Sequence, residues 1–307
     1  MHPLYSLSGL ERICGLVVLV GCQRSGTTLC AQVAGAHPNA FLIDENDGLY
    51  RWFHGLFTHE KSTANATTQA LLTRADKKHA PGLTKTLVDR AGKISLKDSI
   101  THLVLKAPNL TYHYQALQHL GLPTTIVYPV RDVYPVIQSM ARLSNIPFVK
   151  NQIKLLQHYP EIQTRFCHPF KTLTDEAAAP ELRRAALWYI KTALVEQYRQ
   201  TTLALHAFHY EDFVKDSVSH SRSIAALAAL DHHDNMLNHH RCYVGEGPGG
   251  TDRTRPIDRQ SLTPLEQSFE RDTHDRPSIT KGAHDQIHDL TYDLRRSLGY
   301  ATNSRPS

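Results

Sequence analysis

The stretch Leu16-Val17-Val18-Leu19-Val20-Gly21-Cys22-Gln23-Arg24-Ser25-Gly26-Thr27-Thr28 decides the fold of this chain. Its first five residues form a short apolar run rich in β-branched side chains, which is typical of a buried strand in a parallel sheet. Residues 21–28, the glycine loop, show the spacing Gly-x4-Gly followed two positions later by a hydroxyl residue. Such a loop lets successive N–H groups converge on a phosphate, and a helix over 25–36 would add the partial positive charge of its N-terminus.

Short apolar runs and helical patterns alternate along the rest of the chain. We expect further strands at 40–43, 102–105, 124–130 and 205–209, and helices at 68–75, 85–91, 111–120, 133–143, 181–202 and 283–298. Residues 231–282 are rich in Gly, Pro, Asp and Arg, which indicates a long functional loop region. The alternation predicts an α/β fold of the P-loop type: three layers, with a central, mainly parallel sheet flanked by helices, forming a single domain over 1–307.

Composition excludes several classes of protein. With 41% hydrophobic and 21% charged residues, the 307-residue chain is globular rather than disordered. Its net charge of +5 is modest, and no Lys/Arg-rich run indicates a nucleic-acid partner. The apolar run over 15–21 is far shorter than the roughly 20 residues that span a bilayer, so we expect no membrane partner. Five cysteines without regular spacing argue against a disulfide framework and suit a cytoplasmic protein, whose oligomeric state the sequence leaves open.

The glycine loop departs from that of a nucleoside triphosphatase at one position. The lysine that such enzymes place after the second glycine is Thr27 here, and the loop's cation is Arg24 instead. Without that lysine, and without a convincing acidic strand end for Mg²⁺, binding of a nucleoside triphosphate is disfavoured. The loop therefore predicts a site for a single 5′-phosphate that carries one transferable group. Its binding residues would be Arg24, Ser25, Gly26, Thr27 and Thr28.

A second anion site is predicted where the strand at 124–130 ends. Arg131 offers a forked cation, and Ser139 lies about two turns along the following helix, so both can face one phosphate monoester. Asp132 can cap that helix. Alone, this pattern would also fit a surface Arg–Asp pair beside an ordinary helical serine. Together with Arg24, it fits a donor that carries phosphates at both ends of an adenosine, because such a donor needs two anion sites.

These residues resemble a known family. The run Gly21-Cys22-Gln23-Arg24-Ser25-Gly26-Thr27-Thr28-Leu29, followed by Ala36-His37-Pro38, resembles the 5′-phosphosulfate loop of the sulfotransferases, and is nearest to the tyrosylprotein sulfotransferase-like branch. The family's usual proline before the arginine is Gln23 here. Val130-Arg131-Asp132 through Ser139-Met140 resembles the family's 3′-phosphate site, and His209-Tyr210-Glu211-Asp212-Phe213 resembles the segment whose tyrosine, Tyr210 here, helps to hold the nucleotide. The resemblance implies 3′-phosphoadenosine 5′-phosphosulfate (PAPS) as donor, 3′-phosphoadenosine 5′-phosphate (PAP) as product, and no required metal.

Two strand ends supply candidate catalytic residues. Glu45 follows the strand at 40–43, where a carboxylate can take the proton of an acceptor, and the resemblance assigns the base to Glu45 rather than to Asp44. Lys106 follows the strand at 102–105, and a lysine at a buried strand end is costly unless it meets an anion. The resemblance implies that Lys106 stabilises charge on the bridging oxygen and can act as general acid, a role that Arg24 would share.

Other interpretations stay open at this point. The chain could be a P-loop kinase or nucleoside triphosphatase, which Thr27 opposes, or a non-catalytic nucleotide-binding module, which Glu45 and Lys106 oppose. The acceptor hydroxyl or amine would belong to a small molecule in preference to a peptide. Residues 245–255 could form a lid over the donor, and Trp52, Phe53 and His54 could line an acceptor pocket or belong to the core. The histidines at 232, 233, 239 and 240 with Cys242 fit no trusted metal-binding pattern.

Overall fold

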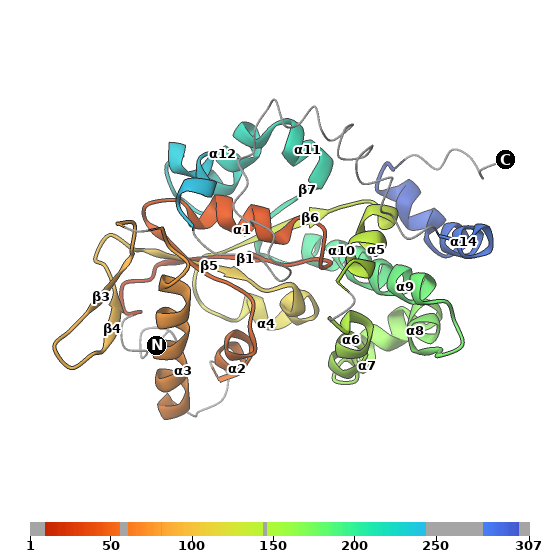
Figure 1. The fold of residues 1–307 in the computed structure, drawn as a ribbon, viewed down its shortest axis with the longest axis horizontal. Helices are drawn as coiled ribbons and strands as arrows, with labels where there is room; N and C mark the ends of the chain where they lie inside the picture. Colours follow the sequence, from red (N-terminus) through yellow and green to blue (C-terminus); the bar gives the residue numbers. More distant parts are fainter. Residues whose placement is uncertain (1–9, 56–60, 81, 144–145, 244–278, 301–307) are drawn as a thin grey trace.

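A five-stranded sheet forms the centre of the computed structural model, which describes residues 10–55, 61–80, 82–143, 146–243 and 279–300 (Figure 1). Its strands run in the order β2-β5-β1-β6-β7, and every neighbouring pair is parallel. Their bounds are β1 Gly15–Leu19, β2 Ala40–Ile43, β5 His102–Lys106, β6 Thr124–Val130 and β7 Ala204–His209. The five strands that the sequence predicts are therefore present, and the expected parallel sheet is confirmed.

The central strand β1 is apolar throughout because both faces of the sheet are covered. Leu16 and Val18 pack into one hydrophobic cluster, whereas Val17 packs into another on the opposite face, as the period-2 alternation of a strand requires. Helices lie on both faces in Figure 1, which confirms the three-layer α/β architecture. The first cluster includes residues of α2 (Asp47–Gly55), α3 (Lys61–Asp76) and α4 (Tyr114–Gln118); the second includes residues of α1 (Thr27–Gly35), α11 (Tyr210–Lys215) and α12 (Ser217–Leu227).

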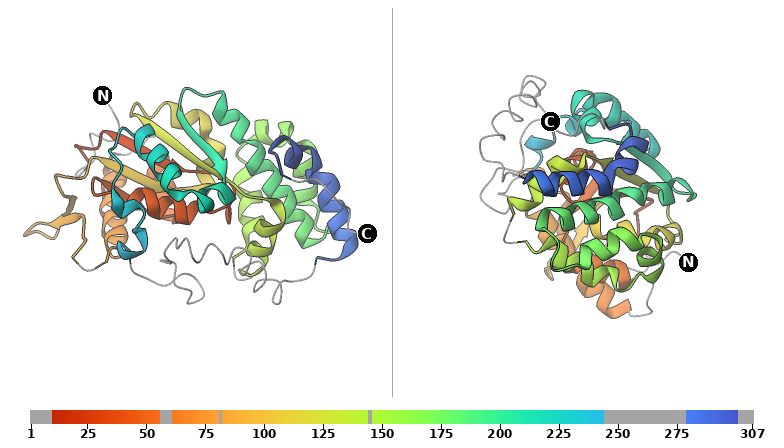
Figure 2. Two further views of the ribbon diagram at one scale, coloured as in Figure 1. Left: turned by 90° about the horizontal axis from the view of Figure 1, so that it is seen from above. Right: turned by 90° about the vertical axis from the view of Figure 1, so that its right-hand side faces the viewer.

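A group of helices packs beside the sheet around a third cluster (Figure 2). Its centre is α9 (Pro180–Ala193), which contacts α5, α6, α8 and α14. The fully buried Trp188 of α9 donates a hydrogen bond from Nε1 to the carbonyl oxygen of Arg131, at 2.8 Å, and so links this group to the end of β6. The surrounding helices are α5 (Val133–Ala141), α6 (Phe148–Leu156), α7 (Pro160–Arg165), α8 (Cys167–Thr174) and α14 (Lys281–Ser297).

Several predicted elements differ from the structure. The helix expected over 85–91 is wrong: β3 (Thr86–Val88) pairs antiparallel with β4 (Ile94–Leu96). The turn between them is stabilised by Asp89, whose carboxylate accepts from the backbone N–H groups of Ala91 and Lys93, and by Gly92 at φ 78°. The helix expected over 181–202 is divided into α9 and α10 (Val195–Arg199), and the one over 111–120 is preceded by the 3-10 helix η2 (Pro108–His113) before α4.

The predicted loop region over 231–282 lies largely outside the described residues. Its described part holds two short 3-10 helices, η3 (Asp234–Met236) and η4 (His239–Arg241), before position 244. The expected lid at 245–255 falls within the part that is not described. Among the residues that are described, no helix has the length and apolar character needed to cross a membrane.

Candidate active site

Each strand of the sheet ends beside a residue that the sequence analysis singled out. Because the strands are parallel, their carboxyl ends meet at one edge, where ligands of such folds bind. The register places Lys106 beside Leu19, the last residue of β1. The glycine loop follows β1, Glu45 follows β2, Lys106 ends β5, Arg131 follows β6, and Tyr210 follows β7. The fold therefore brings together candidates that are spread over 187 positions of sequence, from 24 to 210.

The glycine loop has a backbone that ordinary residues rarely adopt. Gly21 and Gly26 have φ angles of 105° and 94°, and Arg24 lies at φ 72° although it is not a glycine. A β-carbon on Gly26 would come within 2.1 Å of the ring of Tyr210, so only glycine allows this approach. Strained non-glycine residues such as Arg24 cluster at functional sites. The loop leads directly into α1, which begins at Thr27 with Gly26 as its N-cap residue.

Residues of the two predicted anion sites are in direct contact. Nε of Arg24 donates a hydrogen bond of 2.9 Å to Oγ of Ser139 on α5. The guanidinium carbon of Arg131 lies 4.8 Å from the ring centroid of Tyr210, a cation–π arrangement. Among the described residues, two buried polar atoms here have no hydrogen-bond partner, Ser25 Oγ and Arg131 Nε. Because buried polar atoms are normally bonded, one free donor at each predicted site fits an anionic ligand with two phosphate groups.

Asp44 and Glu45 have different surroundings. Nζ of the buried Lys106 lies 3.0 Å from Oδ1 of Asp44 and 3.7 Å from Oε2 of Glu45, and Lys78 pairs with the other oxygen of Asp44. Burial would raise the pKa of Asp44, but the two lysines outweigh it and hold that pKa well below its usual range. Asp44 is thus bound to two cations and is a poor base, whereas the cation nearest to Glu45, Lys106, lies at the longer distance of 3.7 Å.

Tyr50, on α2, orients Glu45. Its hydroxyl donates a hydrogen bond of 2.9 Å to Oε1 of Glu45 and accepts one from the backbone N–H of Asn109 at 3.4 Å. Burial, and next the charge of Glu45, raise the pKa of Tyr50 well above its usual value. Tyr50 therefore keeps its proton and fixes the carboxylate. The sequence analysis missed this residue; its only signal was its position five residues after Glu45.

Lys191 is a second residue that the sequence analysis missed. It lies on α9 and its side chain is fully buried, with Nζ bonded to Gln23 of the glycine loop at 2.9 Å and to the carbonyl oxygen of Pro108 at 2.7 Å. Its signal was weak: a lysine three positions after Trp188 on the buried face of a helix.

The turn after β6 is held by the C-terminal helix. Asp132 caps α5 by accepting from the N–H of Val133 at 2.7 Å, as the sequence predicts. Its carboxylate also receives a forked pair of bonds from Arg295 of α14, with Nε at 2.8 Å and a terminal nitrogen at 3.0 Å. Arg295 is buried. This ion pair fixes the residue next to Arg131. The sequence analysis missed it because Asp132 and Arg295 lie 163 positions apart in the chain.

The structure assigns the aromatic residues after Glu45 that the sequence left undecided. Trp52 and Phe53 are buried in the first core cluster, and Trp52 donates to Thr68 at 3.0 Å, so they are core residues, while His54 is exposed. Within the described ranges, no three His, Cys, Asp or Glu side chains are grouped as a metal ion would require.

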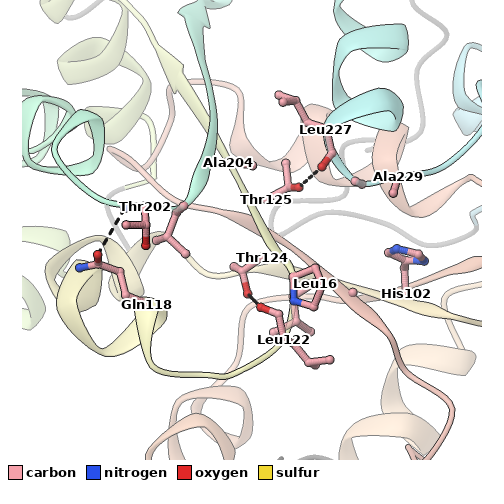
Figure 3. Close-up of a pocket in the computed structure, with 14 residues that line it drawn as sticks. Leu16, His102, Gln118, Leu122, Thr124, Thr125, Thr202, Ala204, Leu227 and Ala229 are labelled. Atoms are coloured by element: carbon pink, nitrogen blue, oxygen red, sulfur yellow. Dashed lines mark hydrogen bonds between the residues drawn. The ribbon is translucent and has the colours of Figure 1, made fainter.

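A cavity of about 330 Å³ lies at the opposite edge of the sheet (Figure 3). Residues at or near the starts of strands line it, including Leu16, His102, Thr124 and Ala204, and it contains none of the candidate site residues. Because the chemistry of a parallel sheet lies at the carboxyl ends of its strands, we assign the candidate site to the glycine-loop edge and not to this cavity.

Comparisons with known proteins identify the family and a similar fold. The model of a family described as the sulfotransferase family matches residues 17–234. A solved sulfotransferase domain from the olefin synthase of Synechococcus superposes with a TM-score of 0.51 at 14% identity, covering 94% of this chain and 96% of that one. A sulfotransferase domain from the curacin biosynthetic pathway has a TM-score of 0.49 at 15% identity, over 94% and 99% of the two chains. No curated protein matches the chain.

Proposed function

The chain belongs to the sulfotransferase family, and we propose that it transfers a sulfuryl group from PAPS to the hydroxyl or amine of an acceptor. The observation that carries this proposal is that the two predicted anion-binding groups lie together at one sheet edge. Arg24 and Ser25 form the first group, and Arg131 and Ser139 form the second, with a buried unbonded donor atom in each. A nucleotide with phosphates on both its 5′ and 3′ positions would engage both groups.

The donor would be held mainly by the glycine loop and the turn after β6. We assign the 5′-phosphosulfate to the N–H groups and side chains of residues 24–28, at the N-terminus of α1. We assign the 3′-phosphate to Arg131 and Ser139. Tyr210, whose ring lies against Gly26 and Arg131, would pack against the nucleotide. These cations supply the positive charge that the anion needs, so the proposal includes no metal.

For the reaction itself we assign three residues. PAPS, when bound, supplies a sulfuryl group on a good phosphate leaving group. Glu45 would take the acceptor proton at Oε2, since Oε1 is bonded to Tyr50, and this role follows the resemblance of the loop to the tyrosylprotein branch. Lys106 and Arg24 would stabilise the charge that develops on the leaving oxygen. Lys106 can also return a proton to that oxygen as general acid.

We favour a small molecule over a peptide as acceptor. Protein-tyrosine sulfation in the branch that the loop resembles is a secretory activity, whereas all five cysteines of this chain are free thiols. Free thiols suit a reducing compartment, so we propose a cytoplasmic enzyme. A screen of extracts with donor-loaded enzyme, read by mass spectrometry as a gain of one sulfuryl group, would identify the acceptor.

Calorimetry tests the donor assignment. We expect PAP to bind when Mg²⁺ is removed by a chelator, and ATP to bind weakly whether or not Mg²⁺ is present, because Thr27 replaces the lysine that grips β- and γ-phosphates. Tight, Mg²⁺-dependent binding of ATP without binding of PAP would overturn the proposal and favour a kinase or nucleoside triphosphatase. Binding of PAP without any sulfuryl transfer to acceptors from such extracts would favour a non-catalytic nucleotide-binding module.

A further inference from the structure

Lys191 is an ammonium group buried beneath the candidate site. Its side chain is 0% exposed, and its charge is met by neutral groups: the amide oxygen of Gln23, the carbonyl oxygen of Pro108, and the ring of Tyr112, whose centroid is 5.0 Å from Nζ. Among the described residues, no carboxylate lies within salt-bridge distance of it. Burying a charge without an anionic partner costs free energy, so this lysine lowers the stability of the protein when no ligand is bound.

The partners of Lys191 belong to the two segments that carry the proposed catalytic cations. Gln23 directly precedes Arg24 in the glycine loop. Pro108 belongs to residues 106–109, the lysine loop, which begins with Lys106. A single ammonium group therefore bonds both loops, at 2.9 and 2.7 Å.

The same contacts continue to Glu45. The amide nitrogen of Gln23 donates to Oδ1 of Asn109 at 2.8 Å, which ties the two loops a second time. The backbone N–H of Asn109 donates to the hydroxyl of Tyr50, and Tyr50 donates to Glu45. A continuous series of hydrogen bonds thus connects Lys191 with the carboxylate that we propose as the base. Such buried networks fix the relative positions of the groups that they join.

A second lysine, the half-buried Lys85, shows what a purely structural role looks like. Nζ of Lys85 donates to the carbonyl oxygens of Gly35, His37 and Ala40 at 2.7 to 2.8 Å. These carbonyls lie at the end of α1 and the start of β2, so Lys85 caps the backbone at the edge remote from the glycine loop. Lys191 differs because one of its partners is a side chain of that loop, next to Arg24.

We propose that Lys191 is a positioning residue for the sulfuryl donor, whose ammonium holds the glycine loop and the lysine loop at a fixed spacing and adds positive potential beneath the 5′-phosphosulfate. This inference rests on the proposed function, because the donor is the anion that would offset the buried charge. Lys191 would not touch the donor. It would act through Gln23 and Pro108, on the placement of Arg24 and Lys106.

The inference predicts a pH dependence of nucleotide binding. Burial lowers the pKa of Lys191 to about 8, partly offset by Cys22 and Glu45. An anion in the glycine loop would favour the charged ammonium, so affinity is complete below pH 8 and falls as pH rises through it. Among the described residues, Cys22 and Glu45 act electrostatically on Lys191, the ring of Tyr112 faces its ammonium, and the hydroxyl of Tyr128 bonds its carbonyl oxygen. Burial raises the pKa of Cys22 to about 12 and raises the pKa values of the two tyrosines well above their usual value, so these three groups do not titrate near pH 8.

Calorimetric titration of PAP into the wild-type protein and Lys191→Met tests this inference. For the wild type we expect affinity to fall about fivefold between about pH 7 and pH 9, with proton uptake near pH 8 seen as a buffer-dependent enthalpy. For Lys191→Met we expect binding about tenfold weaker at neutral pH, no proton uptake and no fall with pH. Lys85→Met is the matched control: it removes a half-buried lysine of equally lowered pKa, about 8, and should keep the wild-type affinity and pH dependence.

The outcomes separate the two proposals. If Lys191→Met lowers the melting temperature as Lys85→Met does but keeps the affinity for PAP and its pH dependence, Lys191 is merely structural and the inference is wrong. If Lys191→Met does not fold, Gln23→Leu removes the same bond from the loop side and should weaken PAP binding about tenfold; unchanged binding would then overturn the inference. If the wild-type protein does not bind PAP at all, it is the proposed donor that fails.

Discussion

At the scale of single residues, the neighbouring carboxylates Asp44 and Glu45 divide their roles by their partners. Two lysines hold Asp44 ionised, while Tyr50 orients Glu45. We expect Glu45→Gln to lower kcat by about a hundredfold or more, because the amide cannot take a proton, while its oxygen can still accept from Tyr50. Kinetics with a sulfuryl acceptor, together with the Kd for PAP, would measure this.

The contrasting variant is Arg131→Ala, which should raise the Kd for PAP because it removes a cation from the 3′-phosphate site that we propose. In Glu45→Gln that Kd should stay within about twofold of wild type, since the change adds no clash and removes no donor contact. Near-normal turnover by Glu45→Gln would show that another group is the base.

Gly26 provides a test of the glycine loop's geometry. A side chain there would be strained at φ 94° and would meet the ring of Tyr210, so Gly26→Ala should displace that ring from Arg131. We expect weaker PAP binding and a loss of stability of about 1–3 kcal/mol, measured by calorimetry and denaturant unfolding. Gly282→Ala is the control, because nothing lies within 4 Å of the added β-carbon and φ is not positive. Equal stability of the two variants would contradict this account.

The sequence singled out candidates such as Arg24, Glu45 and Lys106 because each lies at the end of a strand or just after one. It did not predict Lys191 or Arg295, because their partners lie 168 and 163 positions away in the chain. A buried lysine in a helix has the same local pattern as an exposed one until the opposite side of the contact is known. Their burial depends on tertiary packing that local periodicity does not encode.

At the scale of elements, the C-terminal helix α14 supports the nucleotide site from behind. Arg295 bonds Asp132, next to Arg131, and Tyr300 beyond the helix donates to Glu211, next to Tyr210, at 3.3 Å. The ring of Tyr300 also stacks on His209, with centroids 4.7 Å apart. This end of the chain therefore fixes both neighbours of the Arg131–Tyr210 pair, although it lies far from them in sequence.

Arg295→Met would leave the carboxylate of Asp132 without its forked partner. We expect PAP to bind about tenfold more weakly because the turn that carries Arg131 loosens, and stability to fall by about 3 kcal/mol. Calorimetry and thermal unfolding would measure the two effects. Arg296→Met, at an exposed position of the same helix, should change neither by much. If both variants bound PAP as the wild type does, α14 would have no role in positioning the site.

The elements that the sequence predicted best are those whose environment is simplest. Strands β1 and β6 are buried on both faces, so runs of mainly apolar and β-branched residues identify them. The helices α6, α7 and α8 were missed because they are short and lie between prolines such as Pro147 and Pro160. Most of their contacts are with one another and with α9. The strand β3 was mistaken for part of a helix, although Asp89 and Gly92 form the local turn that joins it to β4.

At the scale of the whole molecule, buried and half-buried histidines make stability depend on pH. Burial lowers the pKa values of His79, His113 and His206 from 6.5 to about 4. Between these values the unfolded chain binds protons that the folded protein does not, so stability that is complete above about pH 6.5 is lost as pH falls toward 4. We expect the melting temperature to fall steadily over that range in thermal unfolding measurements.

His79→Phe is the variant that tests the origin of this effect. The ring of His79 stacks on Phe41 and lies against Tyr243, with both pairs of centroids 5.3 Å apart, so phenylalanine should fit and cannot titrate. Its melting temperature should fall less steeply with acid than that of the wild type. A wild-type melting temperature that does not change over this pH range would refute the explanation.

The sequence predicted that the protein has a parallel sheet, but it did not predict the order of the strands in that sheet. Alternating strands and helices implied a parallel sheet, whereas the order β2-β5-β1-β6-β7 depends on long-range pairing. That order places the glycine loop between Lys106 on one side and Arg131 on the other, which is why residues of both anion groups meet.

The contact between Arg24 and Ser139 has a consequence for ligand selection. If the two phosphates of a nucleotide bind these residues separately, the 2.9 Å bond must be given up on binding. For a nucleotide with a single phosphate, one new ion pair would have to offset the free energy of the broken hydrogen bond. For a doubly phosphorylated nucleotide, two new ion pairs would offset it together. The free energies of binding of the 5′- and 3′-monophosphates would then sum to less than that of the bisphosphate. The bond between Arg24 and Ser139 would thus lower the affinity for abundant singly phosphorylated nucleotides more than the affinity for a nucleotide that carries two phosphates.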